Sequence, residues 1–285
     1  MNSQELMDSI KSRAFVPVSQ STFSTSDLLG FATDIMRTRI VPFVIRFQED
    51  YFLKEEITDR VPSRALGGKI KNVALISDSG CEIQLPRLEP CDLGKSLQGF
   101  VLKGNQIILN CTPRNSNRWM KPKVSYYVRP SHLVLPELAC RVISMTGNDV
   151  EVDQIPPGLE LGSVLDFIGG EPTFDYLGSA YIQNISGKTL SLSSIPKEIE
   201  KGALNVQWMA RLGESPVPQI PLELHPLLAQ SVACQLLESL GFEDKAAAAQ
   251  RVLERMESDV IPVISPRVDD SRKRIINRSQ LVRFS

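Results

Sequence analysis

The sequence predicts an α+β protein in which a helical bundle carries β segments, an inserted duplicated small β-barrel or sandwich, and an extended C-terminal arm. Three observations support this: helical periodicity near both ends of the chain, short β-branched runs in its middle, and an internal repeat. We expect five segments: an N-terminal helical segment of the bundle (1–56), a β-rich segment (57–138), an inserted β module with two 40-residue repeats (139–218), a C-terminal helix hairpin of the bundle (219–264) and the extended arm (265–285).

The N-terminal segment begins with a polar lead-in, residues 1–22, which we expect to be partly mobile with room for one short helix. Residues 26–53 then follow helical spacing, with Ser26-Asp27 as the expected cap. Pro42 lacks a backbone donor, so we expect a kink or break just before it. The apolar positions that set this period are Leu28, Phe31, Ile35, Ile40, Phe43, Phe47 and Phe52.

The C-terminal hairpin is predicted from leucines that recur every three or four residues over 223–240. Gly241 is expected to end this helix, and a second helix should run from Ala246 until Pro262 stops it. Two short helices cannot fold alone. We therefore expect the hairpin to pack against residues 26–53 as the third element of one bundle.

Between these helical ends the period changes to that of strands. Short β-branched runs at 73–76, 100–102, 106–109 and 124–128 are separated by Gly, Pro, Asn and Asp. Gly104-Asn105 is a candidate hairpin turn. Two further connections are expected: a turn before a strand at Ala65–Lys69, and a polar loop from Pro113 to Lys123.

The internal repeat lies within residues 141–205. Aligning VISMTGNDVEVDQIPPGLELGSV with IQNISGKTLSLSSIPKEIEKGAL pairs Gly147 with Gly187 and Ile155 with Ile195 at a constant offset, 187 − 147 = 40. A unit of this size cannot cover its own apolar face. We therefore expect the two copies to close on each other around a pseudo-twofold axis as a small β-barrel or sandwich.

Composition excludes several classes of protein. A formal net charge of −1 is incompatible with a surface that is basic throughout, although it permits a local basic face. The N-terminus lacks a signal peptide pattern and no stretch is apolar enough to span a membrane, so we expect a protein made in a cytoplasm. The five cysteines form no CxxC pair and are expected to be reduced.

The sequence offers no arrangement typical of catalysis. His132 and His225 are the only histidines, neither has a second ligand at metal-binding spacing, and His225 is expected to cap the helix beside it. The acid pairs Glu49-Asp50 and Glu55-Glu56 are interpreted as solvated side chains. Residues 65–69 lack the spacing of a phosphate-binding loop. We therefore predict that the protein is not an enzyme and has no catalytic, cofactor-binding or metal-binding residues.

The basic C-terminal arm is the one notable charge cluster. It is open to three interpretations: a solvated terminus, a docking segment for an acidic protein partner, or a nucleic-acid contact that lacks aromatic stacking residues. Docking is favoured because apolar residues alternate with the basic ones, which a solvated terminus does not need. The residues expected to make this contact are Arg272, Lys273, Arg274, Ile275, Ile276, Arg278, Leu281 and Arg283.

Several segments together resemble a known family. The segments that carry this resemblance are, in chain order, VPFVIRFQEDYF (41–52), PSRALGGKIKNVALI (62–76), VSYYVRP (124–130), IPLELHPLLAQ (220–230) and PRVDDSRKRIINR (266–278). The order of segments is similar to that of podovirus-type head-to-tail connector (adaptor) proteins of tailed bacteriophages. The chain resembles that family over nearly its whole length. The duplicated β module departs from the simplest members.

The resemblance implies a structural virion protein of the phage neck. Such a protein would form a homo-oligomeric ring, usually of twelve subunits, that binds under the portal protein, extends the DNA channel and presents an attachment surface for tail or nozzle proteins. DNA would pass through the lumen without specific binding, and no membrane or cofactor would be involved. An alternative function is a non-viral cytosolic scaffold or binding module whose duplicated β-barrel holds a ligand.

Overall fold

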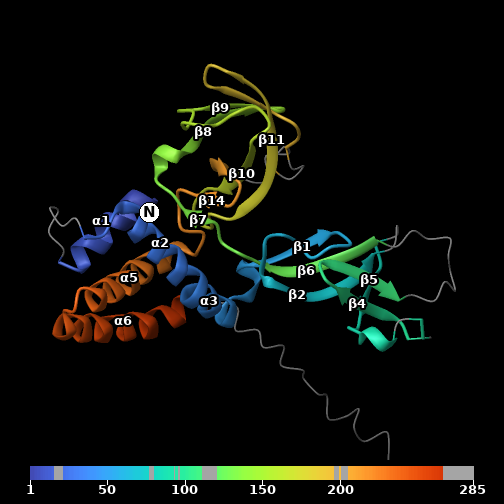
Figure 1. Cartoon of the computed structure of the whole chain (residues 1–285), viewed down its shortest axis with the longest axis horizontal. Coiled ribbons are helices and arrows are strands. Elements are labelled where there is room, and N and C mark those ends of the chain that lie inside the picture. The colour runs from blue at the N-terminus through green and yellow to red at the C-terminus, as the bar shows by residue number, and fades with distance from the viewer. Residues whose placement is uncertain are drawn as a thin grey trace, which may run out of the picture.

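The computed structural model describes residues 1–15, 22–76, 80–92, 94–95, 97–110, 121–195, 199 and 205–265. These residues form three lobes: helices at one end, a closed barrel, and a sheet with a hairpin at the opposite end (Figure 1). The predicted α+β class and the closure of the duplicated module are both confirmed.

The first helix, α1 (Ser3–Arg13), belongs to the folded body and is more than a lead-in. Its side chains at Leu6 and Ile10 have no exposed surface. Asn2 begins the helix with a capping box, in which its side chain accepts from the Glu5 backbone N–H and Glu5 accepts in return. The one short helix expected here is therefore present, and its apolar stripe, although short and surrounded by polar residues, is part of the core.

The second helical segment is continuous through Pro42. Here α2 (Thr25–Ile35) passes into a π-helical turn (Met36–Ile40) and then into α3 (Val41–Phe47). In a π turn each backbone N–H bonds the carbonyl five residues earlier. This wider pattern accommodates Pro42, which has no N–H to donate, so the expected break is a local change of helix type. The expected helical end at residue 53 is wrong, because the chain leaves the helix after Phe47.

The cap of this segment also differs from the prediction. Ser24, and not Ser26, is the first capping residue, since its Oγ accepts from the Asp27 backbone N–H at 3.2 Å. Asp27 in turn accepts from the Ser24 N–H at 2.8 Å. This capping box and the charge of Asp27 near the helix N-terminus both stabilise α2.

The C-terminal helices are α5 (His225–Ser239) and α6 (Glu243–Ile264). Gly241 ends the first of them as predicted, with φ of +73°. The predicted end of the second at Pro262 is wrong, because α6 continues to Ile264. A proline in the last turn removes one intrahelical bond only, which the packed end of the helix tolerates.

Helices from both ends of the chain share one hydrophobic core. Val41, Val44, Leu228 and Leu236 are almost completely buried in it, and Ile264 closes its edge. Both ends are needed because each helix has one apolar stripe and no partner nearby in sequence. Other residues of this core include Leu6, Met7, Ile10, Leu28, Leu29, Met36, Ile40, Leu224, Val232 and Leu253.

The sheet lobe follows directly from α3. Its strands are antiparallel in the order β1 (Leu53–Ile57), β6 (Lys121–Val128), β2 (Ala65–Ile76) and β3 (Glu82–Leu85). Lys121–Lys123, expected in a polar loop, belong to β6, and residues 111–120 of that loop lie outside the described structure.

A second hairpin completes this lobe. The strands β4 (Gly99–Lys103) and β5 (Gln106–Asn110) turn at Gly104-Asn105, which confirms the predicted hairpin. The turn expected at Ala65–Lys69 is wrong. Gly67 and Gly68 adopt φ of +61° and +66° inside β2, where the register with β6 shifts, so they form a bulge within a strand.

The duplicated module is a closed six-stranded barrel. Its first copy contributes β8 (Ala139–Thr146), β9 (Asp149–Val152) and β10 (Val164–Gly169), and its second β11 (Tyr176–Ser186), β12 (Thr189–Leu192) and β13 (Val206–Arg211). The strands close in the order β10-β11-β12-β9-β8-β13. Exchanging the copies preserves every neighbouring pair of strands, which is the symmetry that the repeat predicts.

The centre of the barrel is filled by side chains. Val150 and Leu190, which occupy equivalent positions in the two copies, pair directly across β9 and β12 and have no exposed surface. Phe167 and Leu192 are likewise fully buried. The barrel is therefore a packed core of its own, as expected of small barrels.

No helix in the described part of the chain is long and apolar enough to cross a membrane. Cys91, Cys140 and Cys234 are free thiols, and burial raises the pKa of Cys140 to about 12. Another cysteine, Cys111, lies outside the described residues.

Candidate functional site at the junction of the lobes

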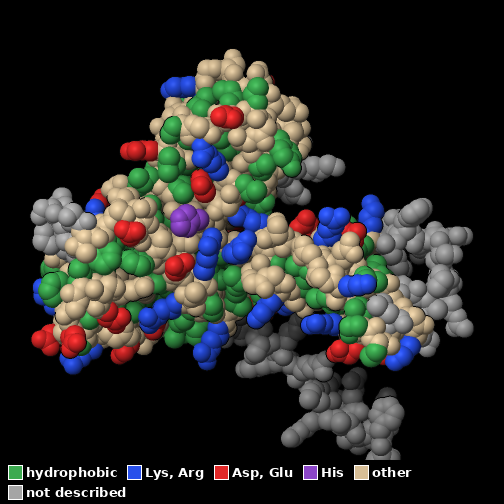
Figure 2. Space-filling view, in the orientation of Figure 1, with side chains coloured by type: hydrophobic (Ala, Val, Ile, Leu, Met, Phe, Trp, Pro, Cys, Tyr) green, Lys and Arg blue, Asp and Glu red, His purple; other side chains and the backbone are tan. Residues whose placement is uncertain are grey.

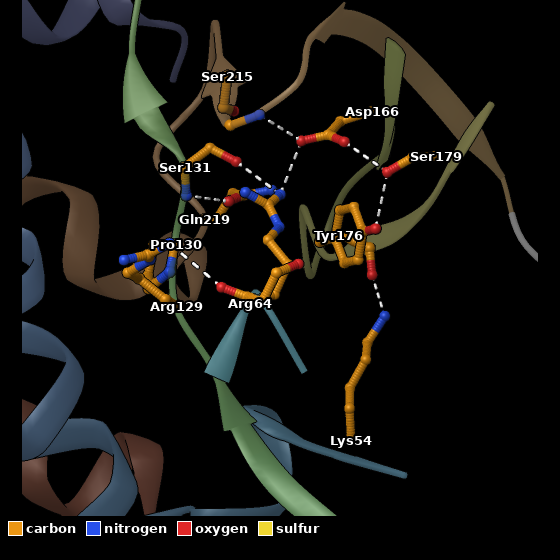
Figure 3. Close-up of polar contacts among 12 residues, drawn as sticks. Lys54, Arg64, Arg129, Pro130, Ser131, Asp166, Tyr176, Ser179, Ser215 and Gln219 are labelled. Atoms are coloured by element: carbon orange, nitrogen blue, oxygen red, sulfur yellow. Dashed lines mark hydrogen bonds and ion pairs between the residues drawn. The ribbon is translucent and has the colours of Figure 1, made fainter. Parts of the chain in front are cut away.

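The three lobes meet at a buried ion pair. Arg64 precedes β2 in the sheet lobe, Asp166 lies on β10 of the barrel, and Arg64 Nη2 is 2.8 Å from Asp166 Oδ2 (Figure 3). The Asp166 side chain has no exposed surface and that of Arg64 is 11% exposed. A pair this deeply buried costs desolvation energy, which only well-placed hydrogen bonds offset. Most of the polar atoms are paired, whereas Arg64 Nε has no hydrogen-bond partner among the described residues.

The barrel side supplies the other partners of Asp166. Ser179 Oγ on β11 donates to Asp166 Oδ1 at 2.6 Å, and the Gly213 backbone N–H donates to Oδ2 at 2.7 Å. Tyr176 and Ser179 are joined by a further hydroxyl hydrogen bond of 2.8 Å. The carboxylate thus accepts hydrogen bonds from Arg64, Ser179 and Gly213, so donors from both lobes meet at its two oxygens.

Two connecting segments form hydrogen bonds on the Arg64 side of the pair. Ser131 Oγ accepts from Arg64 Nη2 at 3.0 Å, and the Ser131 backbone N–H donates to Gln219 Oε1 at 2.7 Å. Ser131 follows β6 and precedes β7 (His132–Leu133), which pairs in parallel with β14 (Glu214–Ser215). The network therefore joins the sheet, the barrel and the chain that leads into α5.

An aromatic side chain covers this network. The Tyr176 ring lies 4.2 Å from the guanidinium carbon of Arg64, a stacking distance. Lys54 on β1 donates from Nζ to the Tyr176 carbonyl, and its ammonium lies 5.1 Å from the same ring (Figure 3). Tyr176 thus contacts two cations of the sheet lobe, Arg64 and Lys54, which fixes β11 against that lobe.

Beside Tyr176 an open cleft of about 490 Å³ separates the sheet from the barrel. One wall is β1 with the chain before β2, and the other is the start of β11. Burial, together with Glu56, raises the pKa of Tyr126 at its base, so this hydroxyl is a hydrogen-bond donor at neutral pH. The lining residues are Lys54, Glu55, Glu56, Pro62, Ser63, Arg64, Tyr126, Tyr176, Leu177 and Gly178.

The acids expected to be only solvated have partners. Glu49 forms an ion pair with Lys71 and accepts from the Tyr127 hydroxyl, and the Lys71 hydrogen bond lowers the pKa of Glu49. Glu55 forms an ion pair with Lys123. The Glu55 contact joins β1 to β6, and the Glu49 contacts join the chain after α3 to β2 and β6, so these two acids have a structural role in the sheet lobe.

The two histidines separate in the fold. His132 is exposed on β7, whereas His225 is 1% exposed at the first position of α5. The expected capping role of His225 is wrong, because Leu224 is the N-cap and His225 lies 3.3 Å from the Ile220 carbonyl through Nε2. Burial lowers the pKa of His225 to about 4, so the ring is neutral at physiological pH.

The residues predicted for partner binding, Arg272 to Arg283, lie outside the described residues. Within the described ranges, no group of three or more His, Cys, Asp or Glu side chains is placed to hold a metal ion. The junction residues Arg64, Asp166 and Gln219 were missed by the sequence analysis. A single carboxylate inside the apolar run VLDFIG (164–169) is the one local signal that could have identified them.

Comparison with known proteins adds no relative. No protein-family model matches this chain. No curated protein is similar enough to count as a relative.

Proposed function

We propose that this chain is a head-to-tail adaptor of a tailed bacteriophage, a structural virion protein that forms a ring under the portal. In this proposal the helices form one bundle that carries the ring contacts and extends the DNA channel. Tail or nozzle proteins attach to the opposite surface. The basic arm, residues 265–285, docks on the portal.

The observation that carries the proposal is how the segments resembling adaptors fit together. Residues 41–52 and 220–230 contribute Val41 and Leu228 to one core, against which Leu66 and Tyr127 of β2 and β6 also pack. β2 and β6 are neighbours in one sheet. Segments far apart in sequence therefore form one continuous body, while the duplicated barrel is a separate lobe with its own core.

The junction also supports a mechanical role. Subunits of a ring must repeat the same contacts, which requires lobes held at fixed positions. The Arg64–Asp166 pair and the Ser131–Gln219 hydrogen bond hold the sheet, the barrel and the helical lobe together through buried polar groups. Polar networks of this kind favour one arrangement of the parts over others.

The alternative function, a cytosolic binding module, would need a ligand site other than the barrel interior. The barrel interior is filled by side chains such as Phe167 and Leu190, so a ligand would have to lie outside the barrel. The cleft beside Tyr176 has the space for a small polar molecule. A small molecule that raises the melting temperature, with loss of the effect in Tyr126→Phe, would favour this alternative.

The adaptor proposal is tested by mixing the purified protein with the portal ring of the same phage. Single-particle imaging should show an added ring beneath the portal, coaxial with its channel. A protein that remains monomeric and leaves the portal unchanged at all concentrations tested would overturn the proposal.

A further inference from the structure

Two arginines beside the junction are held by backbone carbonyls instead of acids. Arg37 on the π turn donates from Nε and Nη2 to the Pro130 carbonyl at 3.1 and 3.0 Å. Arg129, the preceding residue, donates from Nη2 to the Ser63 carbonyl at 3.3 Å. Neither forms an ion pair with an acid of the described chain.

The positive charge at this place is therefore only partly balanced. Burial lowers the pKa of Arg37, the nearby charges of Arg129 and Arg64 act in the same direction, and Asp34 opposes them. Arg64 is neutralised by Asp166, whereas Arg129 is exposed. A partly buried guanidinium without an acid is costly, and an anion placed beside it would recover that cost.

We propose that Arg37 and Arg129 form an anion site that binds a carboxylate of a second copy of this chain. This inference rests on the proposed ring and identifies one of its subunit contacts. The hydrogen bonds to Pro130 and Ser63 use only part of the five N–H donors of each guanidinium and fix the direction of the side chains. The remaining donors suit the two oxygens of a carboxylate.

A protein carboxylate fits this site better than nucleic acid. Duplex DNA presents about one charge per 1.7 Å and requires a row of cations. Here only two guanidiniums, bonded to the Pro130 and Ser63 carbonyls, are available, and Asp34, one turn before Arg37, would repel a continuous polyanion. The net charge of −1 further disfavours an extended nucleic-acid surface.

The complementary acids lie at the opposite end of the helical lobe. Glu238, Glu243 and Asp244 are exposed around the turn between α5 and α6, and none of them is in an ion pair with a described residue. Phe242 between them is 48% exposed. Figure 2 shows acidic side chains at this outer end and mainly Lys and Arg where the helices meet the sheet.

Different patches on one molecule produce a head-to-tail contact, which closes into a ring when the rotation permits. The acidic turn of one copy and the arginine pair of the next are such patches. Phe242 would add apolar area to the charged contact, as central aromatic residues commonly do in interfaces.

The anion site itself is tested without assembly. Wild-type protein and the Arg37→Gln/Arg129→Gln variant are melted in sodium glutarate and in sodium chloride of equal ionic strength, with inorganic phosphate as a second anion. Glutarate should raise the wild-type midpoint by about 2 °C or more and leave the double variant unchanged. Arg255→Gln, at an exposed arginine of α6, is the matched control and should respond like wild type. Equal shifts of the melting midpoint in wild type and double variant would overturn the proposed anion site.

The second copy is tested by charge reversal in the presence of the portal. Arg129→Glu should abolish the ring in sedimentation velocity, and adding Glu243→Arg and Asp244→Arg to the same chain should restore it. Lys103→Glu, on the distant β4 strand, is the charge-matched control and should assemble normally. Failure of the combined reversal to restore a ring that Arg129→Glu blocks would show that another partner occupies the site.

Two other outcomes are equally decisive. A wild-type protein that forms no ring would overturn both the adaptor function and the second copy as occupant. The glutarate measurement would still show whether the anion site exists. Tight binding of a short DNA duplex at about 0.15 M salt, lost in Arg129→Glu, would show that the site binds the phosphates of nucleic acid and not a protein carboxylate.

Discussion

Arg64 and Asp166 are 102 residues apart in the sequence and 2.8 Å apart in space, and they join the sheet lobe to the barrel. The arginine also bonds Ser131, while the aspartate accepts from Ser179 and Gly213. Because both charges are removed from water, neither tolerates the loss of the other. The positions of the lobes therefore depend on this contact.

Asp166→Ala should lower the free energy of unfolding by about 3–5 kcal/mol, since it leaves the Arg64 guanidinium buried without an acid. Urea denaturation measures this loss. Arg255→Ala removes an exposed pair with Asp259, with side chains 85% and 72% exposed, and should change stability by less than about 1 kcal/mol. Comparable effects of the two substitutions would show that the junction does not hold the lobes.

His225 should make the protein less stable in mild acid. Its folded pKa of about 4 lies below the ordinary value of 6.5, so protons bind the unfolded chain first as pH falls. Stability should therefore decrease from pH 6.5 towards pH 4, by about 3 kcal/mol when complete, and level off below. Urea denaturation across this range should show a shallower decrease for His225→Gln. His132→Gln, at the exposed histidine, should follow the wild type, and equal profiles for all three proteins would contradict the assignment.

The repeat predicts equal effects at its two turns. Gly147 and Gly187 have φ of +58° and +60° with open space around the position of a Cβ, so alanine would meet backbone strain only. Gly147→Ala and Gly187→Ala should each cost about 1–2 kcal/mol in thermal unfolding. Gly30→Ala, inside α2 with equal space, should instead stabilise by about 0.5–1 kcal/mol. Clearly unequal costs at the two turns would contradict their equivalence.

The parts of the fold that sequence predicted are those with a repeated signal. The leucine period located α5, and the offset between Gly147 and Gly187 located both barrel hairpins. The errors fall where tertiary contacts override a local rule. The helix α6 continues past Pro262 because its last turn is packed. Gly67 and Gly68 remain within β2 as a bulge because β2 pairs with β6 before and after them.

The junction could not be predicted in the same way. The partners of Asp166 come from Arg64, Ser179 and Gly213, which are unrelated in sequence and meet only after the barrel closes. Each of them is unremarkable in its own segment. The buried aspartate alone indicates that a cation must lie nearby, but not which one.

The C-terminal arm should be needed for assembly and dispensable for folding. The helical core closes at Ile264, which is 5% exposed, so deleting residues 267–285 removes none of the described core. The arm is too polar to form a core of its own and cannot by itself offset the entropy of ordering about 20 residues. On the portal, Arg272, Arg274 and Arg278 would pair with carboxylates while the neighbouring isoleucines bury apolar area, worth roughly 25 cal/mol per Å².

The truncated protein should therefore melt within about 2 °C of wild type and fail to join the portal, as followed by co-sedimentation with the portal ring. Charge and apolar area contribute separately, because exposed ion pairs add little at physiological salt whereas apolar anchors slow dissociation. Replacing Ile275 and Ile276 by serine in the full-length chain should accordingly increase the dissociation rate more than replacing Arg272 by alanine. If the truncated chain joined the portal as well as the complete one, the attachment would have to come from the described lobes.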